Sequence, residues 1–274
     1  LKGVWDENCT VSPNTFLKTF RQLVKNKEFI GFKQNDVQEF LVFFIDTLHE
    51  GLSKEVNISI SGKVLNDTDK MALEAMKTWK QHFKNSYSKI IELFYGQIVS
   101  TIECNDNSSV SRSYDPICFF SIEIPSNMNN PNIYDCFDLF TSKEEMTGDN
   151  QFKCDKTNEM KDAKKNIKIW SSPKILIVCF KRFNNFIKIN KLINFPLENL
   201  DLRKYCSGYN KKSAIYDLYA ISNHSGGTLG GHYYAYCKNQ NGNWYNYNDS
   251  SVEKIDISNI VTPEAYCLFY KKKS

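Results

Sequence analysis

Apolar residues recur at helical spacing in the first third of the chain. Ser12 and Pro13 predict the start of a first helix, with Ser12 as N-cap and Pro13 at the first helical position. A second helix is predicted from about Asn35, with Asn35 as N-cap and Gln38 as its capping-box partner. The predicted apolar faces are Phe16, Leu17, Phe20, Leu23 and Val24 in the first helix, and Val37, Phe40, Leu41, Phe44 and Leu48 in the second.

A polar loop is predicted from Asn57 to Asp69, followed by a third helix that carries Met76, Trp79, Phe83 and Tyr87. From Phe94 the pattern changes to short strands, and Asn132 predicts the cap of one short helix among them. The predicted strands are Gly96 to Cys104, Val110 to Tyr114, Ile117 to Ile124, Ile175 to Phe180, Phe186 to Ile189, Tyr216 to Ser222 and Glu264 to Tyr270, with an extended pair from Phe152 to Asn158. Helices first and strands afterwards indicate an α+β fold.

The segment from His224 to Ser251 predicts a β-hairpin that carries chemistry. A glycine-rich loop leads to His232 on an aromatic strand, a polar turn spans Asn239 to Asn243, and a second aromatic strand follows. A turn centred near residues 240–241 places His232 opposite residues 248 to 250, where an amide and a carboxylate stand. A hydrolytic histidine needs such an orienting partner. Periodicity leaves Asn248, Asp249 and Ser250 open, because a one-residue slip exchanges the two faces of a strand.

Composition narrows the class of protein. The 274 residues are 41% hydrophobic and 24% charged, as in ordinary globular proteins. A net charge of +4 without a basic, aromatic-rich motif predicts no nucleic-acid partner. No apolar run reaches the roughly 20 residues of a membrane span, so no membrane partner is expected. Nine irregularly spaced cysteines predict free thiols in a reducing compartment, hence an intracellular protein in the cytoplasm or nucleus.

Three motifs in order along the chain resemble the ubiquitin-specific proteases, the papain-like cysteine deubiquitinases. The hairpin is similar to that family's histidine box, and residues 31–40 (GFKQNDVQEF) resemble its glutamine–aspartate box. Ile175 to Phe183, ending in Lys-Arg-Phe, resembles its central palm strand. The resemblance implies a papain-like cysteine protease fold: a helical thumb, in part, over residues 1–93, and an antiparallel β palm with β fingers over residues 94–274. Together these would form one catalytic domain that lacks its N-terminal segment.

The resemblance also implies roles for the residues that match. His232 would activate the thiol and protonate the leaving amine, with Asn248 orienting the imidazole and Asp249 as second choice for that role or as an aid to the oxyanion region. Gly230, Gly231 and Tyr233 would line a narrow channel for the Gly-Gly tail of ubiquitin. Gln34, Asp36 and Glu39 match the box that receives the arginine-bearing tail. Asp36 and Glu39 share one helix face, although two acids in a first turn also complement the helix dipole.

Many family members hold a structural zinc between two Cys-x-x-Cys pairs in the fingers. Here the pairs are Cys104 with Asn107 and Cys154 with Thr157, so each keeps its first cysteine and lacks its second. Because a structural zinc takes four Cys or His ligands, we predict no zinc and no other cofactor.

The family's Asn-Thr-Cys box, which carries the nucleophile, is absent from these residues, and Cys9 lacks its context. We therefore expect the nucleophilic cysteine upstream of Leu1, in a deubiquitinating thiol protease that cleaves the (iso)peptide bond after the C-terminal glycine of ubiquitin. Its partners would be ubiquitin or ubiquitinated proteins. The alternatives are a catalytically dead ubiquitin-binding pseudoenzyme and a protease for a ubiquitin-like modifier.

Overall fold

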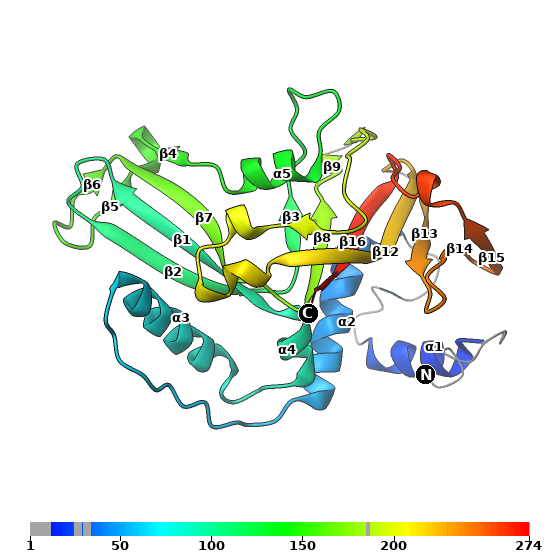
Figure 1. Ribbon diagram of the computed structural model, residues 1–274, viewed down its shortest axis with the longest axis horizontal. Coiled ribbons are helices and arrows are strands. Elements are labelled where there is room, and N and C mark those ends of the chain that lie inside the picture. The colour runs from blue at the N-terminus through cyan, green and yellow to red at the C-terminus, as the bar shows by residue number, and fades with distance from the viewer. Residues whose placement is uncertain (1–11, 25–28, 30–33, 185–186, 229, 274) are drawn as a thin grey trace. The chain divides into compact units, whose positions relative to one another are not determined.

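The computed structural model in Figure 1 describes residues 12–24, 29, 34–184, 187–228 and 230–273. The chain divides into two compact units, Leu1–Asp46 and Thr47–Ser274. The predicted features at Cys9, residues 31–33 and Phe186 lie outside the described residues. The predicted division at residue 93 stays a prediction.

The first unit holds helix α1 (Asn14–Leu23) and the first part of α2 (Val37–Leu52). Phe20 of α1 is buried, with its ring 5.7 Å from those of Phe40 and Phe43. The predicted helices are confirmed, but their starts move by one residue. Pro13, not Ser12, occupies the N-cap position of α1 and makes no side-chain cap. Asp36, not Asn35, accepts the capping bond of α2, because its Oδ1 lies 2.6 Å from the amide of Gln38.

The second unit contains helices α3 (Asp67–Phe83), α4 (Lys89–Phe94) and α5 (Ile133–Phe140). The loop before α3 ends at Asn66, three residues earlier than predicted. Asn66 and Asp69 form a capping box that starts α3 at Asp67, well before the apolar positions from which the helix was predicted. Tyr87, which was predicted to belong to the third helix, lies between α3 and α4, so that part of the prediction is wrong.

Two sheets make up most of this unit. The four-stranded sheet has the order β2-β1-β7-β4, all antiparallel, and Figure 1 shows its long strands running toward the small β5–β6 hairpin. The bounds are β1 Gly96–Cys104, β2 Val110–Ile117, β4 Glu144–Met146, β5 Phe152–Lys153, β6 Met160–Lys161 and β7 Ala163–Ser171. The lysine-rich β7 was missed, because Ala163-Lys164-Lys165-Asn166 lacks the apolar alternation that predicts a strand.

The larger sheet has eight strands. Seven of them follow the order β15-β14-β13-β12-β16-β8-β3, and the eighth, β11, pairs with β12. All neighbours are antiparallel except β3 and β8. The bounds are β3 Phe120–Ile122, β8 Ile175–Phe180, β11 Leu200–Asp201, β12 Ile215–Gly226, β13 Gly231–Lys238, β14 Trp244–Asn248, β15 Ser251–Ile255 and β16 Ala265–Lys272. A separate short hairpin joins β9 (Phe183–Asn184) to β10 (Ile187–Lys188). Short 3-10 turns occupy Gly148–Asn150, Arg203–Tyr205, Tyr209–Ser213 and Ile257–Asn259.

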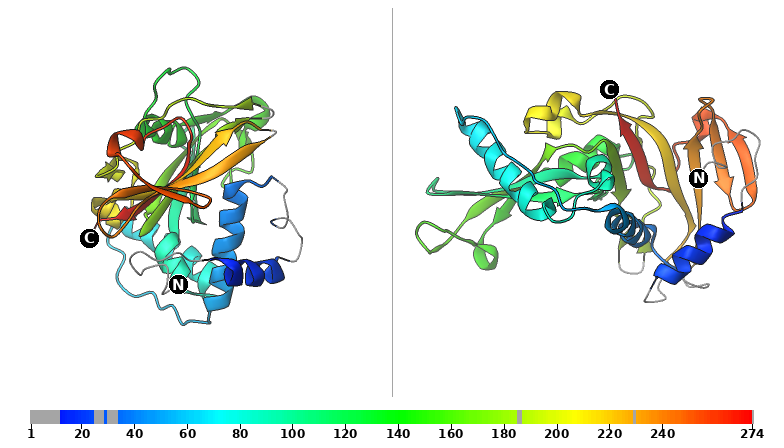
Figure 2. Two further views of the ribbon diagram at one scale, coloured as in Figure 1. Left: turned by 90° about the vertical axis from the view of Figure 1, so that its right-hand side faces the viewer. Right: turned by 90° about the horizontal axis from the view of Figure 1, so that it is seen from below.

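The main core lies on β8 and its neighbours. Leu176, Val178 and Phe180 are fully buried beside Leu268 and Tyr270 of β16, which confirms the predicted buried strand. Burying a large apolar side chain contributes about 1.5–3 kcal/mol, so this central sheet is a stable base for the strands that follow it in the order. Figure 2 shows β12 to β15 as adjacent yellow-to-orange strands that continue from that base.

Candidate active site

The predicted hairpin is present as strands β13 and β14. Ala235 pairs with Tyr247, and Lys238 pairs with Trp244. The turn closes between Asn239 and Asn243, whose backbones bond at 2.9 Å, and Gly242 has φ +79°, a conformation that favours glycine. The turn therefore sets the register that brings His232 to the end of β14.

His232 meets Asn248 through a direct hydrogen bond. Its Nε2 lies 2.6 Å from Oδ1 of Asn248, so the ring nitrogen donates to the amide oxygen. That tautomer leaves Nδ1 with the lone pair that can accept a proton. The histidine side chain is 45% exposed, so solvent and a reactant can reach it.

Asp249 is placed differently, although it is the next residue. It has φ +51°, which turns the chain from β14 into β15. Its Oδ2 lies 3.9 Å from His232 Nε2 and its side chain is 82% exposed. Such an exposed ion pair is weak, and it forms only when His232 is protonated. Of the three residues that periodicity left open, Asn248 is therefore the one that contacts the imidazole directly.

The glycines before His232 differ in how tightly their surroundings require a residue without a side chain. A Cβ on Gly231 would lie 2.2 Å from Nε2 of His224, whose buried ring packs beneath this position. A Cβ on Gly230 would meet nothing within 4 Å. Gly226 has φ +86° and begins the tight turn that Gly227 and Gly230 close with a 2.9 Å backbone bond.

Tyr233 follows His232 directly on β13. Its ring lies 4.7 Å from that of His224 and stacks at 6.3 Å on Tyr266. Phe183 completes this ring cluster by packing edge-on against His224 at 5.2 Å. Tyr233 is half-buried, so one part of its ring supports the sheet while the rest is open to solvent.

The predicted tail-binding residues all lie in the first unit. Gln34 is exposed ahead of α2, and Glu39 is exposed in its first turn. Asp36 is half-buried and caps the helix through one carboxylate oxygen. Asp36 thus has the capping role that was predicted for Asn35, while binding by Gln34, Asp36 and Glu39 stays a prediction.

The two cysteines of the predicted empty zinc site lie at neighbouring turns of the fingers. Cys104 and Cys154 are both buried, and each heads a turn closed by a backbone bond to the residue five positions later. Hydrogen bonds, first of all from the Thr157 hydroxyl, lower the pKa of the Cys154 thiol to about 6. Asn107 has φ +57° in the first turn, whereas the left-handed residue of the second is Asn158. Among the described residues, no group of three or more His, Cys, Asp or Glu side chains is arranged to hold a metal.

The core thiols have the properties expected of structural cysteines. Burial raises the pKa of Cys136 to about 12 and that of Cys206 to about 11. Burial likewise raises the pKa of Cys237. A thiol with a raised pKa is a poor nucleophile, because the thiolate is the reactive form.

One residue beside the hairpin gave no signal in the sequence. Lys188 of β10 is only 9% exposed, and its ammonium donates to the carbonyls of His224 and Gly226. A lone lysine in a strand pattern normally indicates a solvated position. Only the packing of β10 against the end of β12 reveals its contacts.

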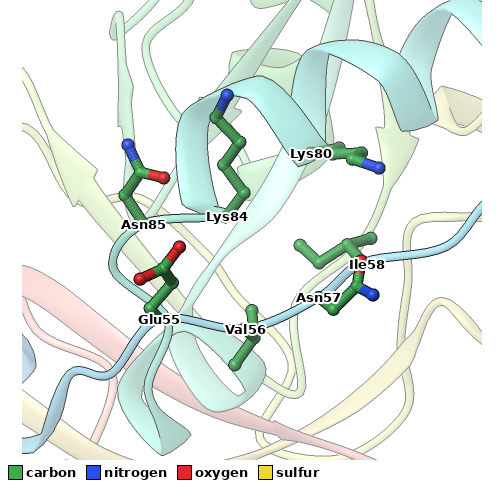
Figure 3. A pocket seen from close by; sticks show the side chains of 7 residues that line it. All are labelled: Glu55, Val56, Asn57, Ile58, Lys80, Lys84 and Asn85. Carbon is green, nitrogen blue, oxygen red and sulfur yellow. The ribbon is translucent and has the colours of Figure 1, made fainter.

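Two hollows in the second unit are separate from this hairpin. One, of about 520 Å³, is lined by Lys80 of α3, by Lys84 and Asn85 just after that helix, and by residues 55–58, as Figure 3 shows. The other, of about 620 Å³, lies between α3 and Trp170. Neither is lined by a residue of β13 or β14.

An α+β fold with a thumb, palm and fingers and a histidine–asparagine hairpin defines the class of papain-like cysteine proteases. A family model described as ubiquitin carboxyl-terminal hydrolase matches residues 1–270. The chain belongs to this family.

Relatives and solved structures agree with that assignment. The chain is 36% identical over its full length to ubiquitin carboxyl-terminal hydrolase 2 of Bos taurus, of which it covers 46%. It is 29% identical to the probable ubiquitin carboxyl-terminal hydrolase R319 of Acanthamoeba polyphaga mimivirus, with 97% of the chain and 67% of the relative covered. The chain thus spans about half the length of the first of these.

A solved SAGA DUB module of Ubp8, Sgf11, Sus1 and Sgf73, bound to monoubiquitin, matches with a TM-score of 0.70 and 28% identity. That match covers 91% of this chain and 51% of the other. A second structure of this module, bound to ubiquitin aldehyde, matches with a TM-score of 0.69 and 28% identity over 91% of this chain and 52% of the other. Within the described part of the chain, no helix is long and apolar enough to cross a membrane.

Proposed function

We propose that this protein is a deubiquitinating thiol protease that hydrolyses the (iso)peptide bond after the C-terminal glycine of ubiquitin. Membership of the ubiquitin carboxyl-terminal hydrolase family supports the class of reaction. The observation that carries the proposal is the 2.6 Å hydrogen bond between His232 and Asn248, because it pairs a half-exposed base with an orienting amide.

The proposed mechanism uses a cysteine on residues that precede Leu1. Its thiol gives a proton to Nδ1 of His232 while sulfur forms a bond to the carbonyl carbon of the terminal glycine. The tetrahedral oxyanion collapses, the C–N bond breaks, and the imidazolium returns the proton to the leaving lysine amine. Water then hydrolyses the thioester: His232 accepts a proton from the water and returns it to the cysteine sulfur as the C–S bond breaks. Asn248 keeps the imidazole in the productive tautomer throughout.

Recognition of ubiquitin is assigned to two places. Gly230, Gly231 and Tyr233 would border the channel for the Gly-Gly tail, since glycine allows a close backbone approach. Asp36, Glu39 and Gln34 would hold the arginine-bearing part of the tail. Asp36 has one carboxylate oxygen in the cap, so Glu39 offers the freer charge.

The test uses the full-length protein and a fluorogenic adduct on the ubiquitin C-terminus. Wild type should turn the adduct over, and His232→Ala should lose about a hundredfold or more, the usual contribution of a general acid–base group. Binding of unmodified ubiquitin should survive the substitution. Turnover that is equally fast with Ala at 232 would refute the role of the hairpin.

The same experiment separates the alternatives. Ubiquitin binding without any turnover by wild type would identify a pseudoenzyme. A panel of activity probes built on ubiquitin and on ubiquitin-like modifiers would identify a different modifier if one of those probes reacts faster than the ubiquitin probe.

A further inference from the structure

Lys188 is a buried charge that the proposed mechanism does not use. It lies in β10 and is 9% exposed, although lysine is almost never so buried without partners. Burial lowers the pKa of its ammonium group, while the Glu264 carboxylate opposes that shift. Its Nζ donates to the carbonyl oxygen of His224 at 2.5 Å and to that of Gly226 at 3.1 Å.

The two carbonyls that Lys188 contacts flank the residue paired with the proposed base. His224 pairs with Tyr233, Ser225 with His232, and Gly226 with Gly231. The ammonium therefore holds the last three residues of β12, directly across from the segment that carries His232. Beyond Gly226 the chain enters the exposed glycine turn, which Gly227 and Gly230 close with a backbone bond of 2.9 Å.

The base of the β9–β10 hairpin is itself fixed. Buried Arg182 donates to the carbonyls of Ala265, Ile189 and Lys191, and it accepts a backbone bond from Ile189. Phe183, which pairs with Lys188, packs against the His224 ring. Lys188 thus reaches from the anchored β9–β10 hairpin to the end of β12, which is also paired with β13.

We propose that Lys188 is a positioning residue that sets the place of His232 by clamping the His224 and Gly226 carbonyls. This inference rests on the proposed function for its effect on turnover. Without the ammonium, the carbonyls of His224 and Gly226 lose a charged donor, and the end of β12 separates from the Gly231–His232 segment more often. The distance from His232 Nδ1 to the reacting thiol then varies, which affects the chemical step more than substrate binding.

The test compares Lys188→Met with Lys191→Met in the full-length protein. Lys191 is a matched control because its ammonium also holds carbonyls, those of Pro125, Ser126 and Met128, but on a loop away from β12. We expect Lys188→Met to lower kcat on the ubiquitin adduct roughly 10- to 100-fold with KM changed less than about threefold. Amide hydrogen exchange of residues 224–233 should quicken about tenfold or more. Lys191→Met should leave both readouts within about twofold.

Wild-type kcat and exchange in Lys188→Met would overturn the inference, and so would equal losses in both variants, which indicate general destabilisation. If Lys188→Met does not fold, nitrogen-15 NMR of the unmodified protein decides the question. The Lys188 ammonium protons should exchange slowly with water, and exchange as fast as in the exposed lysines would refute the clamp. An inactive wild type would refute the proposed function alone, because the exchange readout still reports on Lys188.

Discussion

At the scale of single residues, the contact between His232 and Asn248 is the best-defined feature of the candidate site. Asp249, which periodicity also left open, differs from Asn248 in backbone geometry as well as in chemistry. Asp249 carries the stronger acceptor, but its left-handed backbone directs it into the turn and leaves it exposed.

This difference predicts unequal effects of two adjacent substitutions. Asn248→Ala should lower turnover of the ubiquitin adduct about 10- to 100-fold, because a hydrogen bond to a group that becomes charged contributes about 1.5–3 kcal/mol. Asp249→Ala should lower it less than about fivefold, since an exposed ion pair contributes about 0–1 kcal/mol. Initial rates of the two variants in the full-length protein check this. A larger loss at Asp249 would move the orienting role by one residue.

The acidic pair of α2 requires a second comparison. Because Asp36 caps the helix, its substitution changes stability by about 0.5–2 kcal/mol and confuses a binding test. Exposed Glu39 is the cleaner position. We predict that Glu39→Lys weakens ubiquitin binding roughly tenfold or more, through the lost charge-assisted bond to an arginine, and lowers stability by only about 0.3–1 kcal/mol.

Glu50→Lys, an exposed charge reversal in the last turn of the same helix, serves as the control and should leave binding within about twofold. Calorimetric titration with ubiquitin and a thermal melt measure both effects. Unchanged binding with reduced stability in Glu39→Lys would mean that Glu39 only complements the helix dipole.

At the scale of elements, the β12–β13 connection depends on one glycine more than on its neighbour. Gly231 leaves room for the buried His224 ring, whereas the space around Gly230 is open. The Gly-Gly pair thus has one member that packing requires. The other is unconstrained by the described neighbours.

We therefore predict that Gly231→Ala destabilises the protein by about 1–3 kcal/mol, because the new methyl overlaps an imidazole and a backbone oxygen that cannot both move away. Gly230→Ala should stay within about 0.5 kcal/mol of wild type. Urea unfolding midpoints compare the two. Equal stabilities would show that His224 repacks freely.

At the scale of the whole molecule, the fingers are held by their sheet. Strands β1, β2 and β7 pair along nearly their full lengths, and Lys161 links the two turns of the fingers by donating to Asp106. Buried Cys104 and Cys154 lie in the same region. Because these contacts hold the region together, we expect its fold not to depend on four metal ligands.

We predict that purified protein contains far less than one zinc per chain, and that a chelator leaves the thermal midpoint within about 1 °C, because a structural zinc normally contributes several kcal/mol to folding. Elemental analysis and melts with and without chelator provide the measurement. About one tightly held zinc per chain would contradict the prediction and require ligands other than Asn107 and Thr157.

Much of the fold follows from local sequence. The apolar periods predict α2, β1, β8 and β16 to within a few residues, and Asn132 correctly predicts the start of α5, because each signal involves neighbours in the chain. The turn at Asn239–Asn243 likewise predicts that His232 approaches the end of β14, since a hairpin register depends on its turn.

Tertiary structure decided what depends on residues far apart in sequence. Lys188 and His224 are 36 positions apart, and no local pattern connects them. The need for glycine at 231 comes from a ring that only the paired β12 brings beneath it. The choice of Asn248 over Asp249 depends on the backbone turn into β15. Periodicity cannot make this choice, because a slip of one residue in register exchanges the faces on which adjacent residues lie.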